Sequence, residues 1–237
     1  MSLVEEGFNG SEMGVFYRMN AQSRVLEDVL VRQGVAYQVI GGPRFYERAE
    51  IKDAIAYLQV IDNPSDAVSL MRIANKPRRG IGDTSIARLV TFADAQGISL
   101  WQALPRADEA GVGAQPQKAV RQLHTLLASL MTQAEELSVP QLVERVLEQS
   151  GYLAALEAER TIEAQGRIEN LQELVGVARE YLDNESEPSL SSFLQAISLP
   201  GSSSRKREGR LCVVRPQRSR EVACVSVRRS FARVMPT

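Results

Sequence analysis

The chain has 237 residues, of which 44% are apolar and only 5% aromatic, so it can bury one sizeable aliphatic core or two modest ones. No run of 18 apolar residues occurs, and the first residues form neither a basic nor an apolar leader, which excludes a membrane-spanning class and favours a cytoplasmic protein. The two cysteines, Cys212 and Cys224, have no neighbouring histidine or cysteine pair, which disfavours a zinc site and a disulfide framework.

The formal net charge of −1 conceals an uneven distribution of charge. Residues 200–237 hold ten Arg and Lys against two Glu, whereas residues 1–199 hold 18 basic and 27 acidic side chains. The body of the chain is therefore acidic. If this part of the chain contacts a polyanion such as DNA, the contact must rest on a local cluster of cations and not on a broad basic surface.

The first predicted elements are a strand over residues 14–18 and a helix over residues 21–33, joined by a polar turn that begins at Asn20. The strand ends on Tyr17 and Arg18, next to the start of the helix. An aromatic ring and a guanidinium beside helix amides are suited to a nucleotide base and its phosphates. In the alternative interpretation, Arg18 is a solvated surface cation of an ordinary αβ unit.

A second strand over residues 36–40 and a glycine turn complete this small α/β part. From Ala49 onward, apolar residues recur at helical spacing almost throughout, so the predicted fold class is mainly α. Residues 105–116 are expected to form a loop rich in Gly, Ala and Pro. Three helices are expected from apolar stripes, one along residues 51–61, one along residues 68–73 after the turn at residues 63–66, and one along residues 86–92 that ends at Gly97. Further helices are expected over residues 117–136, 139–150, 162–183 and 188–198.

The strongest candidate for a DNA contact is KPRRGIGDT, residues 76–84. Gly80 and Gly82 let the backbone turn tightly and approach a phosphate, while Ile81 between them anchors the loop in the core. The predicted helix after the loop adds the positive end of its dipole. In the alternative interpretation, this is an ordinary interhelical turn with an Asp83 or Thr84 N-cap. The candidate DNA-binding residues are Lys76, Arg78, Arg79, Gly80, Gly82 and Thr84.

Four segments resemble the UvrD/PcrA/Rep family of superfamily 1 DNA helicases. The stretch YRMNAQSRVLEDVL, residues 17–30, looks like motif IV of that family, and residues 41–66 resemble the segment that follows it. NKPRRGIGDTSI, residues 75–86, resembles its GIG element, and GRIENLQELV, residues 166–175, is similar to a segment near the end of the 2B insertion. The resemblance covers about residues 4–199.

The resemblance implies a helical 2B-like insertion domain attached to a small α/β segment of a RecA-like lobe. Residues 1–62 are then the first segment of the second RecA-like (2A) lobe, and residues 63–199 are the helical 2B-like domain. Tyr17 matches the aromatic that stacks on adenine. Arg18 matches the catalytic arginine that reaches the γ-phosphate of ATP. The GIG element matches a contact to duplex DNA near the unwinding junction.

The family's other ATP-site motifs are absent from these residues. No GxxxxGK[ST] loop occurs, nor an acidic pair like the helicase DExx box, nor the late helicase motifs. The sequence therefore predicts a fragment of an ATP-dependent DNA helicase of repair or replication, without autonomous turnover. ATP, Mg²⁺ and the missing lobe are expected with the full family protein, and a DNA junction is the expected partner. The alternative is a helical protein-interaction module without DNA or ATP activity.

Other polar side chains receive structural interpretations. The charges and aromatics of Arg44, Phe45 and Arg48 are expected to pack and pair, although a position near DNA or a hinge is the functional alternative. Arg167, Glu169 and Asn170 are expected to form a buried or semi-buried polar network. We expect His124 to be an ordinary surface or core histidine of its helix and not a ligand, and Trp101 to be a core anchor.

Residues 200–237 form a basic tail that departs from the family, with no clean period and an abrupt Arg/Ser/Val bias. One hypothesis is a native basic arm that binds nucleic acid electrostatically. The favoured hypothesis is a shifted reading frame, which would leave a disordered segment never selected to fold.

Overall fold

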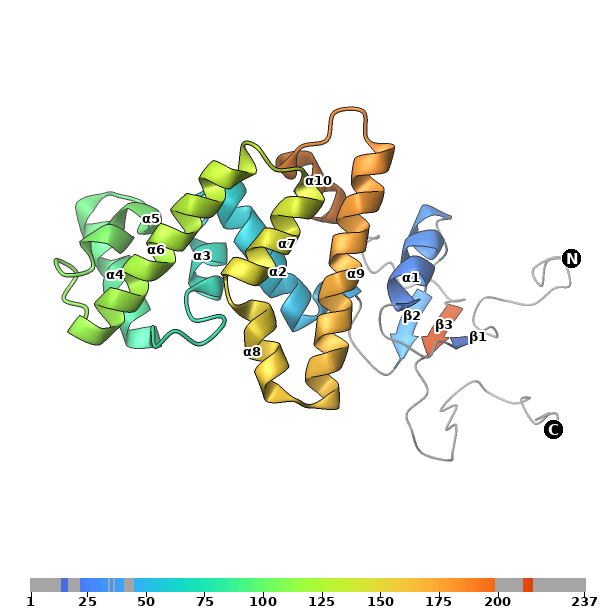
Figure 1. The fold of residues 1–237 in the computed structure, drawn as a ribbon, viewed down its shortest axis with the longest axis horizontal. Coiled ribbons are helices and arrows are strands. Elements are labelled where there is room, and N and C mark those ends of the chain that lie inside the picture. Colours follow the sequence, from blue (N-terminus) through green and yellow to red (C-terminus); the bar gives the residue numbers. More distant parts are fainter. Residues whose placement is uncertain are drawn as a thin grey trace, which may run out of the picture. The chain divides into compact units, whose positions relative to one another are not determined.

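The computed structural model describes residues 14–16, 22–33, 35, 37–40, 45–198 and 211–214. The chain forms two compact units: residues 1–45 with residues 200–237, and residues 46–199. Figure 1 labels their helices and strands.

In the first unit, three parallel strands form one sheet. They are β1 (Gly14–Phe16), β2 (Tyr37–Ile40) and β3 (Leu211–Val214), in the order β1-β3-β2. Gly14 is in register with Cys212 on one side of β3, and Tyr37 is in register with Leu211 on the other. Four residues of the basic tail therefore supply the central strand. The other residues of the tail lie outside the described ones, so the frameshift hypothesis stays a hypothesis.

Helix α1 (Gln22–Arg32) connects β1 to β2 and supplies the small core of this unit. Leu26 and Leu30 pack against Tyr37, with Val15 and Val39 beside them. The Glu27 carboxylate, 5% exposed, accepts a hydrogen bond of 3.2 Å from the Tyr37 hydroxyl. The strand–helix–strand order predicted for this part is confirmed.

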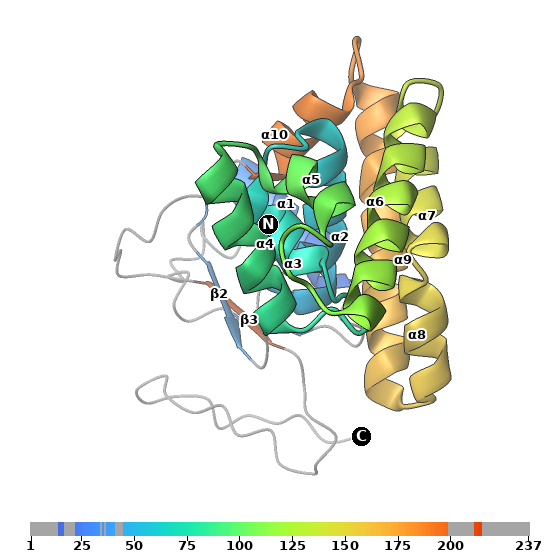
Figure 2. The ribbon, with the colours of Figure 1, turned by 90° about the vertical axis from the view of Figure 1, so that its left-hand side faces the viewer.

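The second unit is helical, with a core of mainly aliphatic side chains. Figure 2 shows the bundle from a second side. Its elements are the 3₁₀ turn η2 (Phe45–Glu47), whose first residue lies in the first unit, α2 (Ala49–Asp62), α3 (Ala67–Ile73), α4 (Asp83–Gln96), α5 (Leu100–Ala103), η3 (Leu104–Arg106), α6 (Ala114–Ala134), α7 (Val139–Gln149), α8 (Tyr152–Glu159), α9 (Ile162–Asn184) and α10 (Leu190–Ser198).

Helix α2 is the centre of this bundle. It packs against α3, α6, α7, α9 and α10, and nine of its residues are buried. The compact units therefore divide between Phe45 and Tyr46, so that α2 belongs to the helical unit. The boundary expected after residue 62 refers to the domains of the helicase family and stays a prediction.

Local sequence signals mark several helix ends. Asp66 accepts hydrogen bonds from the backbone N–H groups of Val68 and Ser69. The Ser69 side chain, together with these backbone bonds, holds the pKa of the Asp66 carboxyl below its usual value. Pro140 lies in the first turn of α7, after the Ser138 capping box. Gly97 ends α4 in the left-handed region, at φ 64°.

Two helices were not predicted, and one begins earlier than expected. Helix α5 has only four residues, and α8 buries only Leu156, so neither carries a repeating apolar stripe that a sequence pattern could reveal. Helix α6 begins at Ala114 instead of residue 117, with Pro116 in its first turn. Among the described residues, no helix is both long and apolar enough to cross a lipid bilayer.

Candidate nucleic-acid interface

The loop between α3 and α4, residues 74–82, carries the candidate DNA contact. Ile81 is 1% exposed, and it lines a small internal cavity together with Val120 and Leu123 of α6. The prediction that Ile81 anchors the loop in the core is confirmed. The flanking Gly80 and Gly82 are exposed to solvent.

The two glycines have different backbone requirements. Gly80 has a φ of 82°, in the left-handed region that glycine adopts at low cost. Its N–H donates a hydrogen bond of 3.2 Å to the Asn75 side-chain oxygen, which also accepts one of 2.8 Å from the Arg79 N–H. Gly82 has an ordinary φ of −79° and no atom within 4 Å of the position of an added Cβ. Only Gly80 is needed for the path of the backbone.

Arg79 holds the loop together from within. One guanidinium nitrogen, Nη1, donates hydrogen bonds to the carbonyls of Lys76 (2.7 Å) and Pro77 (3.2 Å). The other, Nη2, donates to the Tyr57 hydroxyl of α2 (2.7 Å) and to the Ser150 carbonyl after α7 (2.8 Å). A planar guanidinium with several fixed donors can satisfy such a fan of oxygens, which an ammonium cannot. The Arg79 side chain thus joins three segments distant in sequence.

Tyr57 supports the same loop from α2. Its hydroxyl donates a hydrogen bond of 2.5 Å to the Lys76 carbonyl while accepting one from Arg79. Burial raises the pKa of the Tyr57 phenol to about 12, although the positive charge of Arg79 opposes the rise. The phenol is therefore neutral at physiological pH and can donate to the loop.

Arg78 and Lys76 differ from Arg79. Both side chains are exposed, and within the described part of the chain neither makes a hydrogen bond or an ion pair. A cation without an internal partner can approach a phosphate without breaking an existing contact. The six candidate DNA-binding residues thus fall into two kinds. Arg79 is engaged in structure, whereas Lys76, Arg78, Gly80, Gly82 and Thr84 lie on the surface.

The start of α4 adjoins these exposed residues. Gly82 is its N-cap and supplies no side-chain acceptor, so no cap hydrogen bond satisfies the first amides of the helix. The N–H groups of Ser85 and Ile86 bond to the Gly82 carbonyl (2.9 and 3.2 Å), whereas those of Asp83 and Thr84 have no hydrogen-bond partner among the described residues. Such amides suit an anion. The Asp83 carboxylate nearby opposes one.

A second polar cluster fixes the base of the loop. Asp53 of α2, 3% exposed, forms an ion pair of 2.8 Å with Arg72 of α3. It also accepts a hydrogen bond of 2.9 Å from the Tyr152 hydroxyl of α8. Burial, with the nearby Asp53 carboxylate, raises the pKa of Tyr152. These contacts join α3, which precedes the loop, and α8, which follows Ser150, to α2.

The nucleotide-contact residues predicted from the sequence, Tyr17 and Arg18, lie outside the described residues, as does Arg44. Phe45 is fully buried. The roles predicted for Tyr17, Arg18 and Arg44 stay predictions, whereas the packing predicted for Phe45 is confirmed.

The polar network predicted for Arg167, Glu169 and Asn170 is confirmed for Asn170, whose partners are other residues than the predicted ones. Asn170, 2% exposed, accepts a hydrogen bond of 2.8 Å from Arg48 and donates one of 2.5 Å to Glu50. Arg167 is not part of this network, because its side chain is exposed and pairs with Glu159 at 3.5 Å. The network joins α9 to the start of α2.

His124 of α6 stacks on the Trp101 ring of α5, with ring centroids 4.4 Å apart. Burial lowers the pKa of His124, so the stacked imidazole is neutral at physiological pH. The described residues contain no group of three side chains able to hold a metal ion. The stack is therefore best described as a packing contact.

The comparisons with known proteins agree with the resemblance that the loop and its neighbours carry. Residues 1–213 match the UvrD-like helicase C-terminal domain. The chain belongs to the UvrD-like helicase C-terminal domain family. This match continues 14 residues beyond residue 199, where the sequence resemblance was expected to end.

Relatives of this UvrD-like helicase chain include proteins named ATP-dependent DNA helicase PcrA. The chain is 38% identical to that of Bacillus subtilis strain 168 over 189 residues, which are 80% of this chain and 26% of the relative. It is 40% identical to that of Staphylococcus epidermidis over 201 residues, 84% of this chain and 28% of the relative. For Staphylococcus aureus the identity is 39% over the same length. The chain spans about a quarter of these relatives.

Sequence reasoning missed the partners of Arg79 in this UvrD-like helicase chain. Tyr57 is 22 positions away and Ser150 is 71 positions away, and Ser150 contributes only its backbone carbonyl. No spacing pattern in the sequence could have indicated either. The polar Tyr57 within the apolar stripe of α2 was the one available signal.

Proposed function

We propose that these residues are part of an ATP-dependent DNA helicase of repair or replication, in which the α3–α4 loop contacts the phosphates of duplex DNA. The observation that carries this proposal is the exposed Arg78 beside the uncapped amides of α4, on a loop that Arg79 fixes from within. Contacts of this kind position a protein on duplex DNA without reading its sequence.

The same proposal assigns the two units to domains of the family. The helical unit corresponds to a 2B-like insertion, and the three-stranded unit to the edge of a second RecA-like lobe. Tyr17 and Arg18 then contribute base stacking and a γ-phosphate contact to one wall of an ATP site. The other wall, with the phosphate loop and the ligands of Mg²⁺, has to come from sequence that these 237 residues lack.

Titration of a fluorescent blunt duplex tests the DNA contact. Arg78→Gln is expected to weaken binding severalfold at about 0.1 M salt, equally for two duplexes of unrelated sequence. The matched control is Arg145→Gln, which removes one exposed cation from α7. Equal binding by wild type and Arg78→Gln contradicts the proposal and favours a protein-interaction module.

An ATPase assay with and without DNA tests the second part. The 237-residue chain alone is expected to show no turnover, because no loop of backbone amides with Lys and Ser/Thr is present to hold the phosphates. Turnover by the purified chain that Arg18→Ala abolishes contradicts this expectation.

A further inference from the structure

We infer that a groove on α6 is a second phosphate-contact surface, at the same end of the helical unit as the α3–α4 loop. This inference rests on the proposed function. The groove has a volume of about 560 Å³ and lies along the first half of α6. It is lined by Ala114, Gln117, Lys118, Arg121, Gln122, Thr125 and Leu126.

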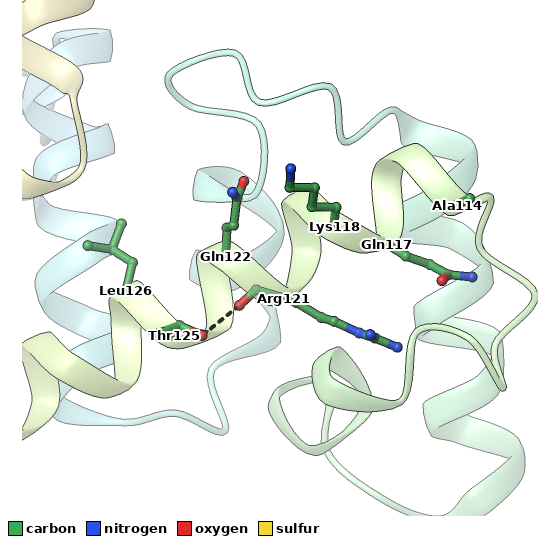
Figure 3. A pocket seen from close by; sticks show the side chains of 7 residues that line it. All are labelled: Ala114, Gln117, Lys118, Arg121, Gln122, Thr125 and Leu126. Atoms are coloured by element: carbon green, nitrogen blue, oxygen red, sulfur yellow. Dashed lines mark hydrogen bonds between the residues drawn. The ribbon is translucent and has the colours of Figure 1, made fainter.

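The lining residues present two cations on either side of the groove. Figure 3 shows Lys118 and Gln122 rising from one side of α6, while Arg121 extends from the other. Lys118 is exposed and makes no hydrogen bond or ion pair within the part of the chain that the structure describes. Two cations separated by a groove match a ridge of negative charge such as a DNA backbone.

Arg121 is paired only weakly. Its guanidinium lies 3.5 Å from the Asp108 carboxylate, and both side chains are more than half exposed. Exposed pairs of this kind contribute little to stability, so a phosphate can replace the carboxylate at little cost. The other nearby carboxylate, Glu109, is already bound to Arg106 at 2.6 Å.

The groove and the loop that carries Arg78 adjoin opposite sides of the same half of α6. Ile81 of the loop and Val120 of α6 line the same small cavity, so the loop lies against the buried side of α6. Arg88 of α4 also donates a hydrogen bond to the Gly111 carbonyl, just before α6 begins. The loop and the groove thus lie at the same end of the helical unit, on different sides of α6.

Within the helical unit, basic side chains outnumber acidic ones in this region. Residues 75–125 contain seven Arg and Lys against four Asp and Glu, whereas residues 126–198 contain four against 13. A polyanion would be attracted to the first part and repelled by the second. The cations of the loop and of α6 together form the local basic surface that an acidic body requires for DNA binding.

The salt dependence of duplex binding tests the inference. Replacing both cations, Lys118→Gln/Arg121→Gln, is expected to lower affinity about tenfold and the slope of log affinity against log salt by about 1–2, because two phosphate contacts are lost. The charge-matched control is Arg145→Gln/Arg179→Gln, on α7 and α9. The charge-retaining Lys118→Arg/Arg121→Lys variant is expected to restore both values.

The outcomes separate this inference from the proposed function. An unchanged slope in Lys118→Gln/Arg121→Gln, with weaker binding by Arg78→Gln, overturns the α6 contact and leaves the loop contact standing. No effect of either change overturns both. Weaker binding that the charge-retaining variant does not restore also overturns the α6 contact. Thermal melting of each variant identifies any loss of binding that comes from unfolding.

Discussion

Arg79 and Tyr57 lie side by side beneath the α3–α4 loop, with a guanidinium nitrogen 2.7 Å from the phenol oxygen and the guanidinium carbon 5.9 Å from the ring centre. The pair joins α2 to the loop, and Arg79 alone reaches the Ser150 carbonyl. Neighbouring arginines in the sequence, Arg78 and Arg79, thus have separate tasks: one is exposed, and the other maintains the shape of the loop.

Arg79→Ala is expected to lower the free energy of unfolding by about 2–4 kcal/mol, because carbonyls of the loop and of Ser150 lose their donors. Arg79→Lys is expected to lose less, since an ammonium can satisfy only some of these oxygens. Denaturant unfolding provides the measurement. The control, Arg78→Ala, is expected to change stability by no more than about 0.5 kcal/mol. Equal losses in Arg78→Ala and Arg79→Ala contradict the division of tasks.

Because of Tyr57, we expect the free energy of unfolding to depend on pH in the alkaline range. Its pKa is raised from 10.0 to about 12, so above pH 10 the unfolded chain releases this proton before the folded chain does. The contribution of Tyr57 is therefore fully present below pH 10 and declines as the pH rises toward 12. The difference in melting temperature between wild type and Tyr57→Phe is expected to shrink over this interval. A difference that stays constant with pH counts against the buried, neutral phenol.

Asn170 joins two buried charged side chains, Arg48 and Glu50. Asn170→Ala is expected to destabilise the chain by about 2–4 kcal/mol, since buried polar groups lose their hydrogen-bond partners. Arg167→Ala, on the same helix but exposed, is expected to cost no more than about 1 kcal/mol. Chemical denaturation of both variants compares them. A loss of stability in Asn170→Ala as small as that in Arg167→Ala would show that the network is dispensable.

We expect alanine substitutions of the two loop glycines to have different effects. Gly80→Ala is expected to cost about 1–2 kcal/mol, because alanine resists a φ of 82°. Gly82→Ala fits its ordinary backbone and empty surroundings and is expected to change stability by less than about 1 kcal/mol. Its methyl group would nevertheless lie next to the first amides of α4 and weaken duplex binding. Melting curves and DNA titrations distinguish these cases. Unaltered DNA binding by Gly82→Ala contradicts the role of these amides.

Much of the fold follows from local sequence signals. The Ser138 capping box with Pro140, and Gly97 at the end of α4, act through neighbouring residues only, so a pattern can reveal them. The strand β3 is different. A central parallel strand is a short apolar run without alternation, and within an irregular basic tail LCVV gave no periodic signal.

The candidate interface was predictable in part. The glycine loop with its cations and the buried Ile81 could be identified from the sequence. The distinct tasks of Arg78 and Arg79 could not, because they depend on Tyr57 and Ser150, which only folding brings to the loop. The groove on α6 was missed for a similar reason. Lys118 and Arg121 gain significance only from the loop that packs against the same helix.

The most direct test of the central claim is amide hydrogen exchange of the chain with and without saturating duplex DNA. If duplex phosphates lie on the α3–α4 loop, exchange in residues 80–85 slows when the duplex is bound, while exchange in α7 (Val139–Gln149) stays the same. Unchanged exchange in residues 80–85 with the duplex demonstrably bound would place the DNA elsewhere and contradict the account.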